Sequence, residues 1–174
     1  MILPVIQERR SVRDFAAREV PEELLQELVR AAQYAPTGMN NRAVEFLVLR
    51  GRAAKEKLFA LLEPKQPFVT EAPALIIPAS DTRRLQVPEP NRTIIATADL
   101  AIASSFIMAQ AVALGLGTVW KHVMAEFAPK VAEAFGLPRE FFLVNAIAVG
   151  YPALKPAPHN ESEFSAAKIH HEQW

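Results

Sequence analysis

The stretch RRSVRDF, residues 9–15, places three arginines and a serine within five positions near the N-terminus. The whole chain carries 19 basic and 19 acidic residues, so this concentration of positive charge is local. Arg9 and Arg13 lie one helical turn apart, or on one side of an extended segment. Guanidinium groups bind phosphate oxygens in bidentate geometry, and Ser11 adds a hydroxyl donor. The stretch is therefore either an anion site or a solvated basic surface, and taken alone it favours the surface.

Composition limits what the protein can be. Its 174 residues predict one domain, residues 1–174, with room for a core. Balanced charge argues against nucleic acid or an acidic membrane as a partner. The absence of cysteine excludes disulfides, thiolate metal sites, iron–sulfur clusters and cysteine nucleophiles. Because the N-terminus lacks the pattern of a secretory signal, we expect a cytoplasmic protein.

Hydrophobic periodicity predicts helices and strands in mixed order. Helices are expected over residues 3–10, 20–35, 51–63, 94–114 and 125–137. Strands are expected over residues 43–50, 73–80 and 141–151, with a short strand or loop over 117–123. In the first helix, apolar positions 3, 5 and 6 should face inward. The polar loop 81–92, with two prolines, is expected to be mobile or lid-like.

The helix expected over residues 94–114 is long enough to span a bilayer. It carries Asp99, and a carboxylate is costly in lipid. A helix that is apolar nearly all round is better explained as buried. In so small a domain, this suggests that a dimer partner covers one side of it.

Two other segments carry polar groups at turns. APTGMNNR, residues 35–42, ends a helix in a turn with a glycine, a hydroxyl and two amides, which is either a binding loop or an ordinary C-cap. GLGTVWKHV, residues 115–123, has a lone G-x-G, which does not support a Rossmann site. No Walker A loop or G-x-S-x-G elbow is present.

Taken in order, five segments resemble the nitroreductase family of FMN-dependent oxidoreductases over nearly the whole chain. They are RRSVRDF, AAQYAPTGMNNR, EAPALIIPA, AVALGLGTVW and FGLPREFFLVNAIAVGYP, and the tail KIHHEQW also resembles the end of the family's shorter members. The resemblance implies an α+β fold, a three-layer α/β/α sandwich with a mostly antiparallel central sheet. It also implies an intertwined homodimer with two FMN molecules at its interface, helix 93–115 as an interface element, and residues 155–174 as an arm crossing to the partner.

The same resemblance assigns cofactor contacts. The implied FMN-binding residues are Arg9, Arg10, Ser11, Arg13, Pro36, Thr37, Gly38, Asn40, Trp120, Lys121 and His122. The first four would hold the phosphate, ribityl and pyrimidine side, with Arg13 at the pyrimidine edge. The loop residues would contact the flavin from the second chain, and residues 120–122 would lie against the isoalloxazine through backbone N–H groups.

The implied reaction has two halves at one site. NADH or NADPH gives hydride to flavin N5 and leaves, and a small acceptor (a nitroaromatic, quinone or flavin) is then reduced. No catalytic side chain and no metal ligand are expected. The alternatives are a flavin-fragmenting or dehalogenating enzyme on the same scaffold, a flavin-binding dimer with little turnover, and an unrelated α/β domain with a basic patch.

Three departures from the family pattern affect the site. Arg42 and Ala43 stand where the family often has glutamine and proline. The segment WKHVM is bulkier than the family's glycines, so His122 is either a pocket residue or a surface histidine. The tail has no arginine for the phosphate, and the candidates to replace it are Lys155, His159 and Lys168.

Overall fold

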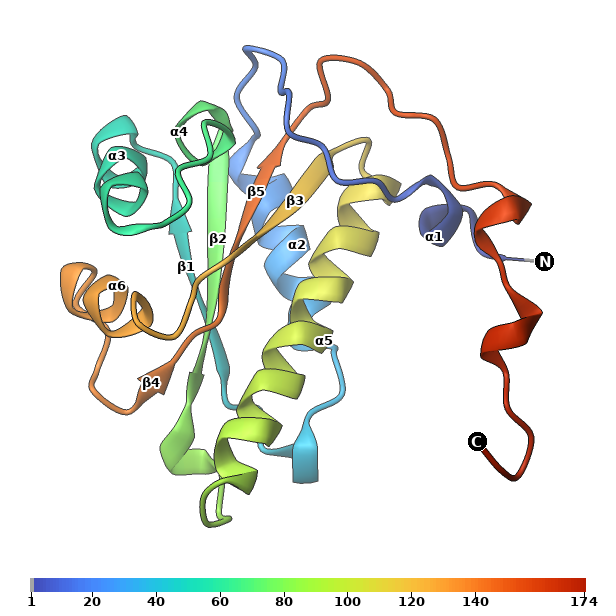
Figure 1. Ribbon diagram of the computed structural model, residues 1–174. Coiled ribbons are helices and arrows are strands. Elements are labelled where there is room, and N and C mark those ends of the chain that lie inside the picture. The colour runs from blue at the N-terminus through green and yellow to red at the C-terminus, as the bar shows by residue number, and fades with distance from the viewer. Residues whose placement is uncertain (1) are drawn as a thin grey trace.

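A computed structural model describes residues 2–174, in which helices cover both faces of one sheet (Figure 1). The helices are α1 (Pro4–Glu8), α2 (Glu22–Gln33), α3 (Arg52–Leu61), α4 (Phe68–Glu71), α5 (Asn91–Ala113) and α6 (Ala128–Ala134). The strands are β1 (Val44–Leu49), β2 (Ala74–Asp81), β3 (Gly117–His122), β4 (Phe141–Phe142) and β5 (Asn145–Gly150). The predicted order of elements and the α/β/α layering are confirmed.

The sheet runs in the order β1-β2-β5-β3, with β4 pairing to β2, and the pairs between these strands are antiparallel. Every residue of β2 is buried, because both faces of this central strand are covered. That explains why ALIIPASD reads as a continuous apolar run rather than an alternating one. β3 lies at an edge of the sheet, which matters for the site.

Two apolar clusters fill the space on either side of the sheet. Along β5, Ala146 and Ala148 face the cluster that includes α3 and α6, whereas Ile147 and Val149 face α2 and α5. This is the two-residue alternation of a strand covered on both sides. On α2, the buried residues fall on one stripe of the helix, as its helical spacing predicted.

α5 is 23 residues long, or roughly 34 Å. Its length and composition would allow it to cross a membrane, but one face packs into the domain through residues such as Leu100, Ile107 and Ala111. Burial in the core therefore accounts for the apolar residues of that face. The other face leaves Ile94 and Phe106 exposed in the single chain.

Two predictions of local structure were wrong. Leu3, which precedes α1, and Ile6 of α1 do not face inward: 64% and 56% of their surfaces are exposed, because no element of the described chain covers that side of α1. The loop after β2 is not a free lid over its first residues. It forms a helical turn, Thr82–Arg84, and then buries Leu85 against Ala43 and Ala96.

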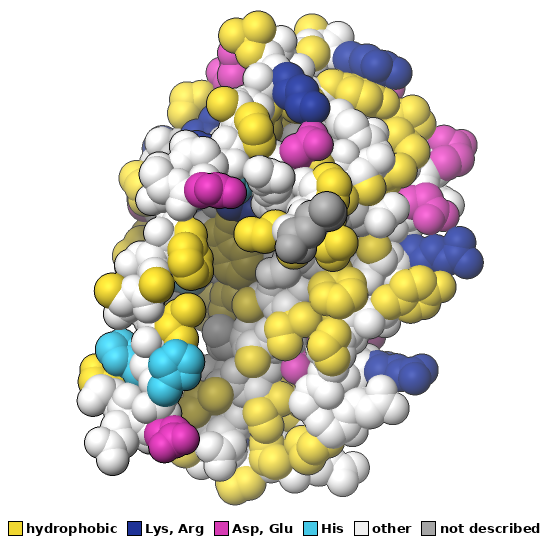
Figure 2. Space-filling view, turned by 90° about the vertical axis from the view of Figure 1, so that its right-hand side faces the viewer, with side chains coloured by type: hydrophobic (Ala, Val, Ile, Leu, Met, Phe, Trp, Pro, Cys, Tyr) yellow, Lys and Arg dark blue, Asp and Glu magenta, His cyan; other side chains and the backbone are white. Residues whose placement is uncertain are grey.

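Residues 155–174 leave the body and run beside α1, with two short helical turns (Figure 1). Figure 2 shows this side of the molecule, where hydrophobic side chains surround a recess next to the tail. Exposed apolar side chains on α1, α5 and the tail include Leu3, Ile6, Phe106, Phe164 and Ile169. The arm crossing to a partner stays a prediction.

Candidate functional site

The segment that contains the arginines is fixed against the edge of β3. The backbone N–H of Val12 donates to the Thr118 carbonyl over 2.9 Å, and Ser11 forms a parallel bridge with Thr118. Gly117 makes this approach possible, since a Cβ there would lie 2.6 Å from Val12 Cγ2. The anchoring of Val12 thus sets where Arg9, Arg10 and Arg13 start.

Arg9 and Arg10 are half-buried and meet the C-terminal tail. Arg9 Nη2 lies 3.5 Å from His159 Nε2, and Arg10 Nη1 lies 3.2 Å from His159 Nδ1. Arg10 also pairs with Glu163 at 3.3 Å, and Glu163 lies 2.5 Å from His159 Nδ1. The hydrogen bond with His159, with a smaller contribution from Arg10, lowers the pKa of the Glu163 carboxyl. The cluster therefore already stabilises one anion.

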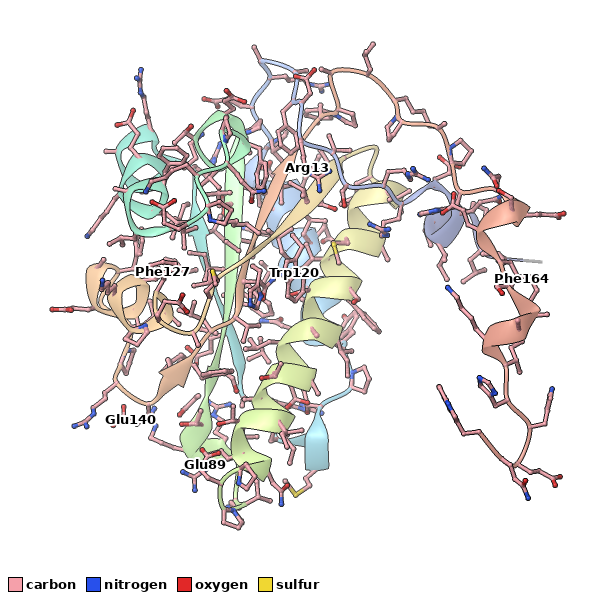
Figure 3. The ribbon with its side chains drawn as sticks, in the orientation of Figure 1. Arg13, Glu89, Trp120, Phe127, Glu140 and Phe164 are labelled. Carbon is pink, nitrogen blue, oxygen red and sulfur yellow. The ribbon has the colours of Figure 1, made fainter. Side chains whose placement is uncertain are left out.

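Of the three tail residues considered for this cluster, the structure brings His159 to it. Lys155 lines the same cavity as Arg10, but there it pairs with Glu8 at 2.9 Å. Arg13 is exposed, and its Nη1 lies 3.4 Å from the Ser11 carbonyl. Figure 3 shows Arg13 near the start of β3 and Trp120 further along the same strand.

Beyond Thr118, the outer edge of β3 pairs with no strand in residues 2–174. The Thr118 carbonyl points outward to Val12, and the Val123 N–H points inward to Val144. Backbone groups in an antiparallel pair alternate in direction, so the N–H groups of Trp120 and His122 point outward. The edge thus offers two backbone donors in line with the arginine segment.

Lys121 does not belong with these two residues. Its side chain lies on the other face of the sheet, where Nζ donates to the Glu63 and Pro64 carbonyls over 3.1 and 3.0 Å. Burial lowers the pKa of its ammonium group. Because strand residues alternate, its backbone also points toward β5 rather than outward. Lys121 therefore faces away from the edge that Trp120 and His122 line.

Asp99 of α5 holds the loop at residues 36–42 through two hydrogen bonds. The Gly38 N–H donates to Asp99 Oδ1 and Asn41 Nδ2 donates to Asp99 Oδ2, both over 2.8 Å. Asp99 is buried, so it is a structural carboxylate within this chain. A Cβ on Gly38 would meet Ile95 Cγ2 at 2.7 Å, which explains the glycine.

The same loop holds three non-glycine residues in left-handed conformations. Met39, Asn40 and Arg42 have φ values of 54°, 53° and 49°. Such conformations cost energy and persist only where surrounding contacts impose them. Here the contacts are those to Asp99 and a 3.2 Å hydrogen bond from the Arg42 N–H to Thr37 Oγ1. The loop is strained and held in one shape.

Within one chain, the arginine segment and the 36–42 loop are far apart. Arg10 lines a cavity with Val112, near the end of α5, whereas the loop is tied to Asp99, thirteen residues earlier on that helix. Thirteen helical residues span about 20 Å. Figure 1 places the two segments toward opposite ends of α5.

The Nitroreductase family model matches residues 6–63 and 59–151, nearly all of the folded body. The chain belongs to the nitroreductase family. A protein of Methanothermobacter thermautotrophicus, provisionally named NADH dehydrogenase/NAD(P)H nitroreductase, is 33% identical to this chain over 175 residues. The match covers 99% of this chain and 87% of that protein. The FMN reductase [NAD(P)H] of Bacillus subtilis is 24% identical over 90% of this chain and 68% of its own.

Solved structures agree with this membership. An FMN-dependent nitroreductase from Clostridium difficile R20291 superposes with a TM-score of 0.85 at 25% identity, and the match covers 98% of both chains. The likeness extends over the full length of that nitroreductase, so the tail and the body are both included.

One polar pair in this nitroreductase-family chain was missed by sequence reasoning. Asn145, opposite His122 in the strand register, donates from Nδ2 to Ser104 Oγ of α5 over 3.0 Å. Both are fully buried, and among residues 2–174 Asn145 Oδ1 has no hydrogen-bond partner. An asparagine inside the apolar run LVNAIAV was the available signal.

The histidines near the C-terminus form no ligand cluster. His170 stacks on Trp174 with ring centroids 4.3 Å apart. Across residues 2–174, no group of three acidic or histidine side chains is arranged to hold a metal ion.

Proposed function

We propose that this member of the nitroreductase family is an FMN-dependent oxidoreductase that takes hydride from NADH or NADPH. It then reduces a small acceptor, such as a nitroaromatic, a quinone or a flavin. The observation that carries the proposal is the anchoring of the arginine–serine segment beside an open strand edge. The relatives named as FMN-dependent or NAD(P)H-dependent support the choice of cofactors.

The residues present fit FMN. Arg10 already pairs with the Glu163 carboxylate and Arg9 lies beside it against His159, and a phosphate carries more negative charge and more acceptor oxygens than that carboxylate. The outward N–H groups of Trp120 and His122 suit acceptor atoms on a planar ring. Arg13 is exposed next to this edge, where its cation suits the pyrimidine side.

Bound FMN would supply a ring that accepts and returns a hydride. The protein's own groups would bind the FMN and adjust its electrostatic environment. The guanidinium of Arg13 stabilises negative charge at the pyrimidine edge, and the β3 N–H groups orient the ring. The site needs no nucleophilic side chain and no metal. Donor and acceptor use the same place in turn, which makes the kinetics ping-pong.

A homodimer completes the site. The distance between the arginine segment and the 36–42 loop is the reason: Pro36, Thr37, Gly38 and Asn40 reach a flavin on the partner, not on their own chain. The exposed face of α5 and the apolar side chains of α1 supply the contact surface. Residues 1–174 act as one cytoplasmic domain, with residues 155–174 as the arm that crosses.

Colour tests the proposal directly. The protein purified with added FMN is expected to be yellow, to release flavin on denaturation, and to bleach when NADH or NADPH is added without oxygen. A colourless protein in excess FMN contradicts the proposal. Protein that is yellow but does not bleach supports the passive flavin-binding dimer. A screen of reduced protein against nitroaromatics, quinones and halogenated phenols separates the reductase from the dehalogenating enzyme, and breakdown of the flavin itself marks the flavin-fragmenting one.

A further inference from the structure

A second polar cavity of about 720 Å³ lies where α2 ends, between the 36–42 loop and the start of β1. Its polar lining is Gln33, Tyr34, Thr37, Asn40, Arg42, Glu45 and Arg84. Two guanidinium groups and one carboxylate therefore face one hollow, and the cavity carries a net positive charge at neutral pH.

Arg42 is the more available of the two cations. Its Nε donates to Asn40 Oδ1 over 3.2 Å. Among residues 2–174, the ion pairs of this region involve Arg84, which lies 3.7 Å from Asp81 and 4.0 Å from Glu45, and not Arg42. Arg84 is partly neutralised, whereas the two terminal nitrogens of Arg42 keep their donor capacity.

The position of Arg42 is held from both sides of its backbone. Its N–H donates to Thr37 Oγ1 over 3.2 Å, and its carbonyl accepts from Arg84 Nη1 over 3.0 Å. The left-handed φ of 49° is imposed by these contacts. Because the backbone of Arg42 is held and its Nε is bonded to Asn40, its guanidinium loses less freedom when it binds an anion.

We propose that this cavity binds an anionic group, a phosphate or a carboxylate, of a substrate that reacts at the flavin. The inference rests on the proposed function, because Thr37 and Asn40 are both cavity lining and predicted flavin contacts. Arg42 supplies a bidentate fork, and Arg84 adds a second positive charge. The anionic group is either the 2′-phosphate of NADPH or a carboxylate on the acceptor.

The test compares, within each of two ligand pairs, a ligand that carries an additional anionic group with a counterpart that lacks it, on the FMN-loaded protein. Adenosine 2′,5′-bisphosphate is paired with AMP, and 4-nitrobenzoate is paired with nitrobenzene. Dissociation constants are measured by calorimetry, and kcat/KM is measured for NADPH against NADH and for the two acceptors. The variants are Arg42→Gln and Arg42→Lys. The matched control is Arg50→Gln, at the other end of β1, where the arginine pairs with Glu22.

Arg42→Gln is expected to weaken the more highly charged member of one pair about tenfold, as the loss of one charge-assisted contact predicts, and its counterpart less than twofold. Arg42→Lys should lie between, and Arg50→Gln should match the unmodified protein. An effect on the bisphosphate identifies the donor phosphate, and an effect on nitrobenzoate identifies the acceptor carboxylate. Equal changes within each pair, or none, overturn the proposal.

Two further results distinguish failure of this proposal from failure of the proposed function. If unmodified protein fails to take up FMN, the proposed function fails before any variant is compared. If Arg42→Gln does not fold, sodium pyrophosphate is titrated against the unmodified FMN-loaded protein. Competition with the bisphosphate or with nitrobenzoate, but not with AMP or nitrobenzene, supports the cavity, and lack of competition with either anion overturns it.

Discussion

At the scale of single residues, Asp99 shows how one buried carboxylate determines the shape of a loop. Its two oxygens accept from the Gly38 N–H and from Asn41 Nδ2, both over 2.8 Å. A polar residue in an apolar helix was visible in the sequence. Its partners were not, because they lie 61 and 58 positions away in the chain.

Asp99→Ala should lower the free energy of unfolding by about 2–3 kcal/mol, because two partly buried donors would lose their acceptor. Asp99→Asn should lose less, since one amide oxygen can still accept from Gly38. Urea denaturation of the three proteins measures this. Equal stability of Asp99→Ala and the unmodified protein contradicts the role given to Asp99.

Asp81 gives the fold a dependence on acid. Hydrogen bonds from Arg83 hold the pKa of the Asp81 carboxyl below its usual value. The charged form is therefore favoured by folding, and its stabilisation is present above the unfolded pKa of about 4 and lost as pH falls through the folded pKa. Asp81→Asn should flatten the decrease in stability below about pH 4.

Denaturant titrations from about pH 6 down to about pH 2 provide the measurement. Arg83→Gln serves as the matched variant, since it removes the partner and should flatten the same decrease. Slopes that stay the same in both variants contradict the assignment.

At the scale of elements, hydrophobic spacing predicted most of the fold. α2, α3, α5 and β2 follow their patterns closely because each buries a face within its own chain. The pattern gave a wrong direction for α1, since no described element covers that side of it. The family resemblance grouped Lys121 with Trp120 and His122, although strict alternation along the strand could have placed its side chain on the opposite face.

The sequence predicted only part of the candidate site, because only some of its residues lie in local motifs. The arginines and the 36–42 loop are local motifs, so they can be found by reading along the chain. The contacts of His159 with Arg9 and Arg10 join residues 150 and 149 positions apart. Composition could name His159 as a candidate in the tail but could not select it over Lys155.

Gly117 lies where β3 meets the arginine segment. A substitution there therefore tests whether this contact positions residues 9–13. In Gly117→Ala, the new Cβ would lie 2.6–2.9 Å from three Val12 atoms, so residues 9–13 must shift. We expect the FMN dissociation constant to rise at least about tenfold, with about 1–3 kcal/mol lost in stability.

Flavin fluorescence titration and denaturation measure these two effects. Gly51→Ala is the control, because its Cβ meets nothing within 4 Å and its φ of −64° suits alanine. Unchanged FMN affinity in Gly117→Ala contradicts the role given to the segment.

At the scale of the whole molecule, flavin uptake and dimerisation should be inseparable. Phe106 is exposed on α5, on the surface proposed to meet the partner. Phe106→Glu should raise the dimer dissociation constant by at least about tenfold, because it places a charge in an apolar contact. Flavin content should fall in parallel.

Sedimentation velocity and flavin absorbance follow the two quantities in one sample. Lys130→Glu, an exposed charge change on α6 across the sheet from α5, should alter neither. A monomer that keeps its full flavin content would show that the site is complete in one chain.

The open side of β3 also bears on how the protein must be handled. Unsatisfied strand edges recruit other strands, and natural sheets guard them with charge, bulges or a covering segment. Here residues 9–13 cover only the first part, and the exposed backbone of Trp120 and His122 has no such guard within residues 2–174. Protein prepared from riboflavin-starved cells should therefore precipitate on storage sooner than protein saturated with the coenzyme. The bound coenzyme would cover the open strand edge and so keep the protein in solution.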